Sequence, residues 1–295
     1  MRAWGKHRVA IMLMGMLAGC SPVGVLNALA PTDGVTVTVD VPYGAEPRQS
    51  LDVYAPAEGR SPVIVFLYGG GWRSGDKAMY RFVASALAAR GYATIVPDYR
   101  VYPTALYPDF LRDAAQAVAW TRREIGRYGG DPCRITLMGH SAGAYIAVML
   151  GLDRRWLAEY AVDPDRDIAG IVGLSGPYDF LPLRDPELQT IFAPSGDLRT
   201  SQPIAYARGD APPMLLAHGR IDRVVWPLNT IRLAAALRAQ GGRVEERIYP
   251  ALGHAPMVGA LAGPLRWLAP VMADVDAFVG GETRACSADL AAVGP

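Results

Sequence analysis

The sequence predicts a single α/β domain built on a mostly parallel, doubly wound sheet. Two patterns carry this prediction. Residues 62–68 and 168–174 are continuous apolar runs, as expected of strands that are covered on both faces. From residue 62 onward, strand-like runs alternate with helix-like segments, which indicates parallel strands joined by helical crossovers. The 295 residues fit one large domain, and neither an internal repeat nor a second domain is visible.

Each element follows from a local pattern, taken in chain order. Residues 35–41 and 49–54 alternate apolar and polar side chains, which predicts an antiparallel hairpin. Further strands are predicted at 62–68, 92–96, 134–138, 168–174, 214–217 and 244–249. Helices are predicted at 80–90, 108–128, 142–151, 228–240 and 270–279. The stretch 176–213, rich in Pro, Asp and Gly, is too long for a simple loop and predicts a small cap insertion.

The composition excludes several classes of protein. Basic and acidic residues nearly balance, at 29 against 28, and no run of like charges occurs, which argues against nucleic acid as a partner. With 51% hydrophobic and 19% charged residues, the chain is too apolar to be disordered. No apolar stretch reaches the roughly 18 residues that a membrane-spanning helix needs. A chain of this length buries enough surface to fold without a metal or a disulfide framework. The oligomeric state is left open.

The N-terminus has the layout of an export signal. Residues 1–19 combine three basic residues with a short apolar run and lead into Leu17-Ala18-Gly19-Cys20. This sequence resembles the lipobox of bacterial lipoproteins, which implies cleavage before Cys20 and a lipid anchor on its sulfur. With Ser21 next in the chain, the resemblance favours an exported lipoprotein of the bacterial cell envelope, in the outer membrane and facing the periplasm. An ordinary signal peptide with a coincidental cysteine is the alternative.

The predicted layout after this leader has three parts. Residues 20–34 hold the lipidated cysteine and a tether without clear periodicity, residues 35–280 form the α/β domain, and residues 281–295 form a tail. Two cysteines remain beyond the anchor, Cys133 before a strand and Cys286 in the tail. An oxidising compartment permits a disulfide between them, and two free thiols are the alternative.

A nucleophilic serine is predicted after the third central strand. The strand at 134–138 runs into Gly139-His140-Ser141-Ala142-Gly143, and a helix-forming segment follows. This is the G-x-S-x-G pattern in the strand–turn–helix context that it requires. The turn is so tight that the two glycines avoid clashes which a Cβ atom would cause. The serine hydroxyl is then expected to project above the sheet, at the positive end of the following helix.

The serine needs a base to remove its proton, and the chain has four histidines. His7 is removed with the leader. His140 lies inside the turn and is expected to pack away from the reactive face of Ser141. His218 ends a strand and is expected to shape the following loop. His254 follows the last strand in a loop downstream of the serine, so we predict that it is the base.

The base in turn needs a carboxylate that fixes its tautomer. Asp222 lies in the loop after the strand at 214–217, where open sheets gather their functional groups. Asp179 and Asp210 are rivals, but one begins the cap and the other precedes a strand. Serine, then acid, then histidine is the order that this serine pattern commonly shows, so we predict Asp222 as the partner of His254.

A tetrahedral intermediate also needs N–H donors for its negative oxygen. The first is expected from Ala142, the residue after the nucleophile. The second is expected from the loop after the strand at 62–68, where three glycines follow Tyr68 and can turn their N–H groups toward a substrate. A phosphate-binding loop is the rival interpretation, but the Walker spacing is absent.

Taken together, these motifs resemble a known group of enzymes. The segments GGGWRSGDK, DYR, GGDPCRITLMGHSAGA, LSGPYDF, HGRID and GHA occur in this order. They resemble α/β-hydrolase esterases of the hormone-sensitive-lipase and feruloyl/acetyl-xylan-esterase type, which also include arylformamidases, over residues 35–279. The resemblance implies the α/β-hydrolase fold and assigns the oxyanion donors to Gly70, Gly71 and Ala142. The chain departs from the family at Tyr68, where a histidine is usual, although a tyrosine hydroxyl can donate a similar bond.

The sequence therefore predicts a serine carboxylesterase that acts on a small ester of short or medium acyl length. No metal and no organic cofactor is implied. Cleavage of an amide by the same residues and a non-catalytic, ligand-binding lipoprotein are the alternatives. Aromatic residues near strand ends are candidates for the pocket wall, with core packing as the alternative: Trp72, Tyr102, Tyr178 and Phe180.

Overall fold

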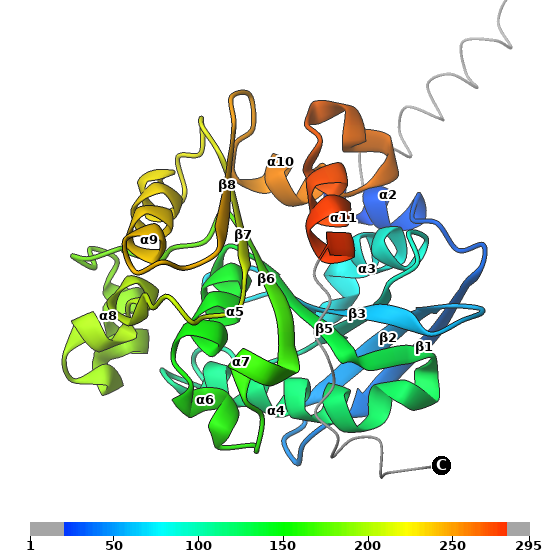
Figure 1. Cartoon of the computed structure of the whole chain (residues 1–295), viewed down its shortest axis with the longest axis horizontal. Helices are drawn as coiled ribbons and strands as arrows, with labels where there is room; N and C mark the ends of the chain where they lie inside the picture. Colours follow the sequence, from blue (N-terminus) through cyan, green and yellow to red (C-terminus); the bar gives the residue numbers. More distant parts are fainter. Residues whose placement is uncertain (1–20, 282–295) are drawn as a thin grey trace, which may run out of the picture.

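The computed structural model describes residues 21–281 and contains an eight-stranded sheet of order β1-β2-β4-β3-β5-β6-β7-β8 (Figure 1). The strands are β1 (Val35–Pro42), β2 (Ser50–Pro56), β3 (Ser61–Leu67), β4 (Ala93–Pro97), β5 (Gly130–His140), β6 (Ile168–Leu174), β7 (Met214–Gly219) and β8 (Val244–Tyr249). The β1–β2 and β2–β4 pairs are antiparallel, and all pairs from β4 to β8 are parallel. The predicted fold class is therefore confirmed.

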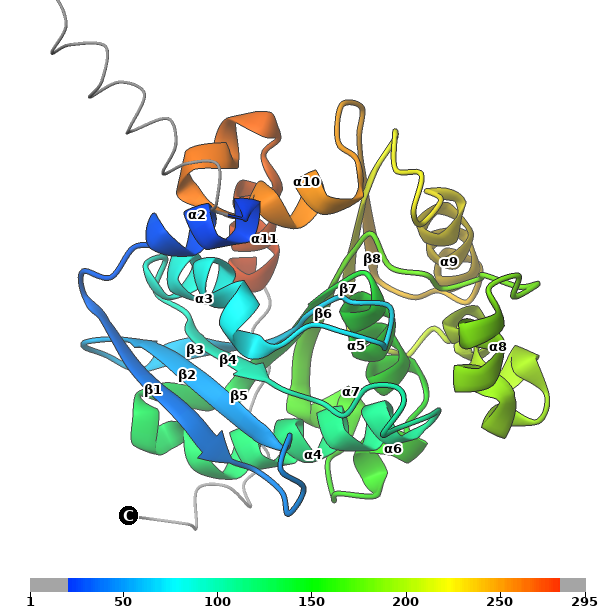
Figure 2. The ribbon, with the colours of Figure 1, turned by 180° about the vertical axis from the view of Figure 1, so that it is seen from behind.

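Helices cover both faces of the sheet, with α3 and α11 on one face and α4 and α5 on the other (Figures 1 and 2). The longer helices are α3 (Arg81–Ala88), α4 (Asp109–Glu124), α5 (Ala142–Leu152), α9 (Leu228–Ala239) and α11 (Val271–Gly281). In α4 the largely apolar face formed by Phe110, Ala114, Val118 and Thr121 is buried, and in α5 every residue is buried. A helix that is apolar on all sides belongs inside a fold, as α5 does between the sheet and its neighbours.

The carboxyl ends of the central strands meet at one edge of the sheet. Leu67 at the end of β3 pairs with Gly139 in β5, and His140 at the end of β5 pairs with Leu174 in β6. Leu174 in turn pairs with Ala217 in β7. In open α/β sheets, functional groups gather at this edge, and here the segments after β3, β5, β7 and β8 carry the predicted site residues.

The segment 176–213 forms several short helices instead of one continuous loop. They are α8 (Pro186–Phe192), η3 (Ala193–Ser195), η4 (Leu198–Ser201) and η5 (Pro203–Tyr206). Aromatic rings join this segment to the rest of the domain. Phe192 lies edge-on to Trp72, with ring centroids 4.9 Å apart, and Phe180 stacks on Trp72 at 6.0 Å.

The prediction of an irregular tether over residues 20–34 is wrong for part of that range, because α2 (Pro22–Ala28) is helical. The Ser21 hydroxyl caps the helix, and Pro22 occupies its first turn, where a missing N–H costs nothing. The side chain of Asn27 then donates to the carbonyl of Ala78 and accepts from the N–H of Phe82. These two bonds hold α2 beside α3.

Several short helices have no clear signal in the sequence. They are α6 (Arg155–Ala158), α7 (Pro164–Asp167), α10 (His254–Gly259), η1 (Lys77–Tyr80) and η6 (Gly263–Leu268), whereas η2 (Ile125–Tyr128) is the end of the predicted helix 108–128. Strand β5 is also longer than the predicted 134–138, since it begins at Gly130 against Ser61 of β3. Periodicity over four to six residues is too short to identify a helix.

The predicted leader, the anchor at Cys20, the tail and Cys286 lie outside the described residues. Cys133 is disulfide-bonded. Within residues 21–281, no helix has the length and apolar content that crossing a membrane requires.

Candidate active site

Ser141 occupies a strained turn between β5 and α5. Its φ is 55° and its ψ is −122°, a conformation that costs a non-glycine residue free energy. Its N–H donates to the carbonyl of Leu174 at 2.9 Å, which ties the turn to the end of β6. Two residues on, a Cβ atom at Gly143 would lie 1.9 Å from the carbonyl oxygen of Leu67. Only glycine therefore allows α5 to approach the end of β3 this closely.

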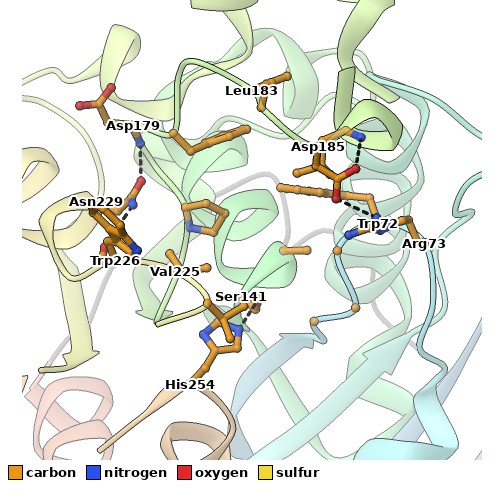
Figure 3. Close-up of a pocket in the computed structure, with 18 of the residues that line it drawn as sticks. Trp72, Arg73, Ser141, Asp179, Leu183, Asp185, Val225, Trp226, Asn229 and His254 are labelled. Atoms are coloured by element: carbon orange, nitrogen blue, oxygen red, sulfur yellow. Dashed lines mark hydrogen bonds and ion pairs between the residues drawn. The ribbon is translucent and has the colours of Figure 1, made fainter. Parts of the chain in front are cut away.

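A chain of hydrogen bonds joins the three residues that the sequence singled out. The Ser141 hydroxyl lies 2.8 Å from His254 Nε2, and His254 Nδ1 lies 2.8 Å from Asp222 Oδ2 (Figure 3 draws Ser141 and His254). The carboxylate can only accept, so Nδ1 donates to it and Nε2 is free to accept the serine proton. The sequence pattern placed His254 in the loop after the last strand. In the structure it is instead the first residue of α10.

Asp222 is buried, and four N–H groups surround its carboxylate. Oδ1 accepts from the N–H groups of Val224 and Val225 at 2.9 and 3.0 Å. Oδ2 lies 3.3 Å from His218 Nε2, in addition to its bond with His254. Burial raises the pKa of Asp222, but the bonds from His218, His254 and the Val225 N–H outweigh it and hold the pKa below its usual range. The carboxylate therefore stays ionised beside His254.

His218 is the polar neighbour whose role the sequence reasoning missed. Its side chain is fully buried, and its Nε2 lies 2.9 Å from the carbonyl oxygen of Val225 as well as near Asp222. Its Nδ1 lies 2.8 Å from the Thr230 hydroxyl. His218 therefore shapes the loop, as expected, and also holds the carboxylate. The signal was its position four residues before Asp222, as the penultimate residue of β7.

The prediction that His140 packs away from the reactive face is wrong. Its ring centroid lies 4.8 Å from that of His254, and its Nε2–H donates to the His254 carbonyl at 3.1 Å. Burial, with the nearby His254 adding to it, lowers the pKa of His140 to about 3. His140 is thus a neutral support beneath His254.

The loop after β3 makes a tight turn beside Ser141. Gly70 has a φ of 139°, and a Cβ atom there would lie 2.0 Å from the carbonyl oxygen of Ser74. The Gly70 carbonyl accepts from the N–H groups of Arg73 and Ser74, both at 3.1 Å. Gly70, Gly71 and Ala142 all line the same cavity as Ser141. The N–H of Ala142 is the first of α5 and has no carbonyl a turn earlier to accept it.

Tyr68, which stands where the resembling family has histidine, supports this turn from below. It is fully buried, and its hydroxyl donates to Asp98 Oδ1 at 2.7 Å. Asp98 Oδ1 also accepts from the N–H of Lys77, and Arg48 Nη2 donates to the Tyr68 hydroxyl at 3.0 Å. The Tyr99 hydroxyl donates to the Tyr68 carbonyl at 2.7 Å. The tyrosine hydroxyl thus donates the kind of bracing bond expected of it, here to Asp98.

These residues open into a cavity of about 1080 Å³. Much of its wall is apolar and includes Trp72, Phe180, Leu181, Leu183, Leu188 and Trp226. Of the four candidate aromatic residues, Trp72 and Phe180 line the cavity. Tyr102 and Tyr178 do not, and Tyr178 is fully buried in the core.

Polar contacts fix the cavity wall on two sides (Figure 3). On one side, Arg73 Nη1 pairs with Asp185 at 3.0 Å and Glu187 at 2.6 Å, which connects the glycine turn to α8. On the other, Asn229 Oδ1 accepts from the N–H of Asp179 at 2.8 Å, and Asn229 Nδ2 donates to the carbonyl of Trp226 at 3.1 Å.

The two rival carboxylates take part in other contacts. Asp179 lines the cavity and pairs with Arg232 at 2.8 Å. Asp210 pairs with Arg154 and Arg208. Neither forms a hydrogen bond with His254 among the described residues. Within that same range, no group of three or more His, Cys, Asp or Glu side chains is placed to hold a metal ion.

A protein-family model matches residues 51–237, which is more than half of the chain and includes Ser141 and Asp222. The chain belongs to the BD-FAE family. The resemblance to α/β-hydrolase esterases that the sequence motifs predicted is therefore confirmed. In this BD-FAE chain, His254 lies beyond the matched stretch.

Curated relatives extend the comparison. Esterase LipC from Mycobacterium tuberculosis is 33% identical over 249 residues, which cover 75% of this chain and 61% of LipC. Isoprenylcysteine alpha-carbonyl methylesterase ICME from Arabidopsis thaliana is 32% identical over 246 residues, 76% of this chain and 57% of ICME. The BD-FAE chain thus spans between 57% and 61% of the length of these relatives.

Solved structures agree on the fold. Esterase B from Lactobacillus rhamnosis has a TM-score of 0.74 at 19% identity, over 94% of this chain and 97% of that one. A truncated carbohydrate esterase from gut microbiota has a TM-score of 0.72 at 20% identity, over 85% of this chain and 98% of that one. At these identities the likeness concerns the fold, and it confirms the predicted α/β-hydrolase architecture.

Proposed function

We propose that this BD-FAE chain is a serine carboxylesterase that hydrolyses short- or medium-chain esters through an acyl-enzyme intermediate. The observation that carries the proposal is the hydrogen-bond chain from Ser141 through His254 to Asp222, with 2.8 Å at each step, on the wall of a large, partly apolar cavity. This is the geometry by which an activated serine is recognised on any fold.

In the first half of the reaction, His254 Nε2 takes the proton from the Ser141 hydroxyl as Oγ attacks the ester carbonyl carbon. The carbonyl π electrons move onto oxygen, and this oxyanion accepts hydrogen bonds from the N–H groups of Gly70, Gly71 and Ala142. Asp222 stabilises the imidazolium that forms on His254. When the C–O bond to the alcohol breaks, His254 returns its proton to the departing oxygen, and the acyl group stays on Ser141.

In the second half, water replaces the alcohol. His254 removes a proton from the water, whose oxygen attacks the acyl carbon and forms a second tetrahedral intermediate. The bond to Ser141 Oγ then breaks, and His254 protonates the serine oxygen. The carboxylic acid is released, and the site returns to its starting state without a net change in the enzyme.

Two observations support an ester and not an amide as the substrate: the names of the relatives and the apolar wall of the cavity. LipC is named an esterase and ICME a methylesterase. The apolar wall around Trp72, Phe180 and Leu183 suits an acyl chain of short or medium length, because such a chain gains free energy on leaving water.

The proposed location follows from the leader. We propose that Cys20 carries a lipid anchor, and that the enzyme is held at the bacterial envelope, on the periplasmic side of the outer membrane. Mass spectrometry of the N-terminal peptide tests this. A diacylated Cys20 at the new N-terminus supports the anchor, whereas a free thiol or a cleavage site elsewhere contradicts it.

The activity is tested with p-nitrophenyl butyrate and with the matching anilide, N-(4-nitrophenyl)butyramide. We expect ester turnover by the wild type and a loss of about four orders of magnitude or more in kcat for Ser141→Ala. Faster turnover of the anilide than of the ester would favour amide hydrolysis instead. Retention of most ester turnover by Ser141→Ala would contradict the serine mechanism.

A further inference from the structure

An exposed apolar surface borders the mouth of the cavity. Ten large apolar side chains are exposed among the described residues, and five of them fall within one loop and the first turn of the next helix. We name this surface the rim patch, and it consists of Ile221, Val224, Trp226, Leu228 and Ile231. Trp226 is 66% exposed and Val224 is 72% exposed. A cluster of this kind is uncommon on a surface that faces only water.

The unpaired charges on the segment that carries the rim patch have one sign. Arg220, directly before the first member, and Arg223, between the first two members, are exposed, and neither has an ion-pair partner among residues 21–281. The single carboxylate between residues 220 and 231 is Asp222, which is buried against His254. The surface therefore presents apolar side chains with two unneutralised guanidinium groups, and it complements an anionic surface.

The backbone beneath the rim patch is held from inside the protein. The N–H groups of Val224 and Val225 donate to Asp222, and the Val225 carbonyl accepts from His218. The Trp226 carbonyl accepts from Asn229 at 3.1 Å. The apolar side chains are thus presented on a braced loop, so a partner does not need to order the loop when it binds.

The rim patch is continuous with the cavity. Val224, Trp226 and Leu228 also line the cavity that contains Ser141, and Figure 3 draws Trp226 on the side of this cavity that Asn229 supports. Ile231 follows Leu228 by three residues in α9, so both lie on one face of the helix. Ile221, Ile231, Arg220 and Arg223 do not line the cavity.

We propose that the rim patch docks onto the surface of an anionic phospholipid membrane and holds the cavity mouth against it. Tryptophan and aliphatic side chains enter the boundary between headgroups and acyl chains, and arginine is attracted by anionic headgroups. The docking itself is independent of turnover. Its consequence, delivery of lipid-borne esters to Ser141, rests on the proposed function.

The experiment measures co-sedimentation of residues 20–295, the chain that the predicted cleavage before Cys20 leaves, with phospholipid vesicles. Cys20→Ser is introduced so that the predicted acylation site does not contribute. We expect association with vesicles of phosphatidylcholine and phosphatidylglycerol, and about tenfold weaker association with phosphatidylcholine alone. No association with anionic vesicles, or equal association with both, overturns the proposal.

Variants assign the association to the rim patch. Arg223→Glu with Ile231→Glu is expected to weaken association at least about tenfold, while turnover of a soluble ester remains, since neither residue lines the cavity. The matched control is Val39→Glu with Arg127→Glu, which makes the same change of charge at β1 and η2 and is expected to bind like the parent. Equal weakening by both variants contradicts the assignment. Arg220→Gln with Arg223→Gln, a milder change, is expected to abolish only the preference for anionic vesicles.

Trp226 supplies an independent signal. We expect its fluorescence to shift to shorter wavelength on anionic vesicles, and Trp226→Phe to remove this shift. Trp267→Phe, a control at the most exposed tryptophan of residues 21–281, is expected to retain it. A dimer in analytical ultracentrifugation that Arg223→Glu with Ile231→Glu dissociates would instead assign the rim patch to a second copy of the chain and overturn the proposal.

Discussion

The two sides of the cavity are built in different ways. On the side of the glycine turn, Tyr68 and Asp98 are buried, and hydrogen bonds from Tyr99, Lys77 and the Tyr68 hydroxyl itself hold the start of the loop. On the other side, the loop after β7 turns its polar contacts inward and its apolar side chains outward. Figure 3 places Trp72 and Trp226 on opposite sides of Ser141. Trp72 is 3% exposed, whereas Trp226 is 66% exposed.

This contrast separates two physical tasks. Groups that exchange protons or stabilise charge need fixed positions in a site that excludes water, because electrostatic interactions are stronger there and require no reorganisation. Groups that contact the variable part of a substrate or a membrane gain most from apolar area. Within the loop after β7 both tasks occur in adjacent residues, since Asp222 is buried while Ile221 and Arg223 are exposed.

Among the changes that compare the two sides of the cavity, the largest effect is expected from removing a buried donor behind Asp222. His218→Phe keeps an aromatic ring but takes the N–H away from Asp222 and from the Val225 carbonyl. Loss of a hydrogen bond to a charged group costs about 1.5–3 kcal/mol, so we expect kcat to fall by about 10- to 100-fold, with KM little changed. Thr230→Val, which removes only the contact with His218 Nδ1, is expected to lose less. An unchanged kcat for His218→Phe would contradict a positioning role.

The second effect concerns stability in acid. The pKa of His140 is lowered to about 3 by burial, whereas an unfolded histidine takes up its proton near pH 6.5. Between these values the unfolded state binds more protons, so the free energy of unfolding falls as the pH falls, by about 2.5 kcal/mol at pH 4.5.

His140→Gln tests this effect, because it keeps an N–H for the His254 carbonyl and cannot titrate. Between pH 7 and pH 4.5 we expect the wild type to lose about 2.5 kcal/mol more stability than the variant in urea unfolding. Equal losses would show that His140 does not stay neutral in the folded protein.

A smaller effect is expected at Tyr68. Tyr68→Phe leaves Asp98 with its bond from the Lys77 N–H but without the hydroxyl, at a cost of about 1 kcal/mol in the free energy of unfolding. Because the glycine turn starts at the next residue, kcat is expected to fall several-fold. Tyr102→Phe is the control, since its hydroxyl has no hydrogen-bond partner among the described residues. Equal free energies of unfolding and equal kcat values for Tyr68→Phe and Tyr102→Phe would contradict the bracing role of Tyr68.

The smallest effect on stability is expected on the exposed side. Trp226→Ala removes a solvent-facing ring, so the free energy of unfolding should change by less than about 0.5 kcal/mol. KM for a soluble ester should rise several-fold with kcat nearly constant, because the ring lines the cavity but takes no part in proton transfer. A fall in kcat comparable with that of His218→Phe would contradict the proposal that Trp226 contacts the substrate without affecting proton transfer.

The sequence predicted the sheet because buried strands such as β3 and β6 leave unbroken apolar runs that no other element explains. It also led to Ser141, Asp222 and His254, since each follows a strand end and the topology brings strand ends together. The structure places the three in one hydrogen-bond chain.

The parts that the sequence did not reveal depend on contacts between distant segments. The position of His140 under His254 is set by the start of α10, far along the chain. The helix α2 depends on bonds from Asn27 to the η1–α3 region. Exposure of Trp226 has no sequence signal either, because a tryptophan near a strand end is more often part of the core.

The central claim is that Ser141 is the activated nucleophile. Incubation with a fluorophosphonate followed by peptide mass spectrometry tests it most directly, since the reagent bonds covalently to an activated serine oxygen. We predict one phosphonyl group per chain, located on Ser141 in the wild type and absent from Ser141→Ala, with labelling greatly slowed in His254→Ala. Labelling of another residue, or undiminished labelling of Ser141→Ala, would contradict the account.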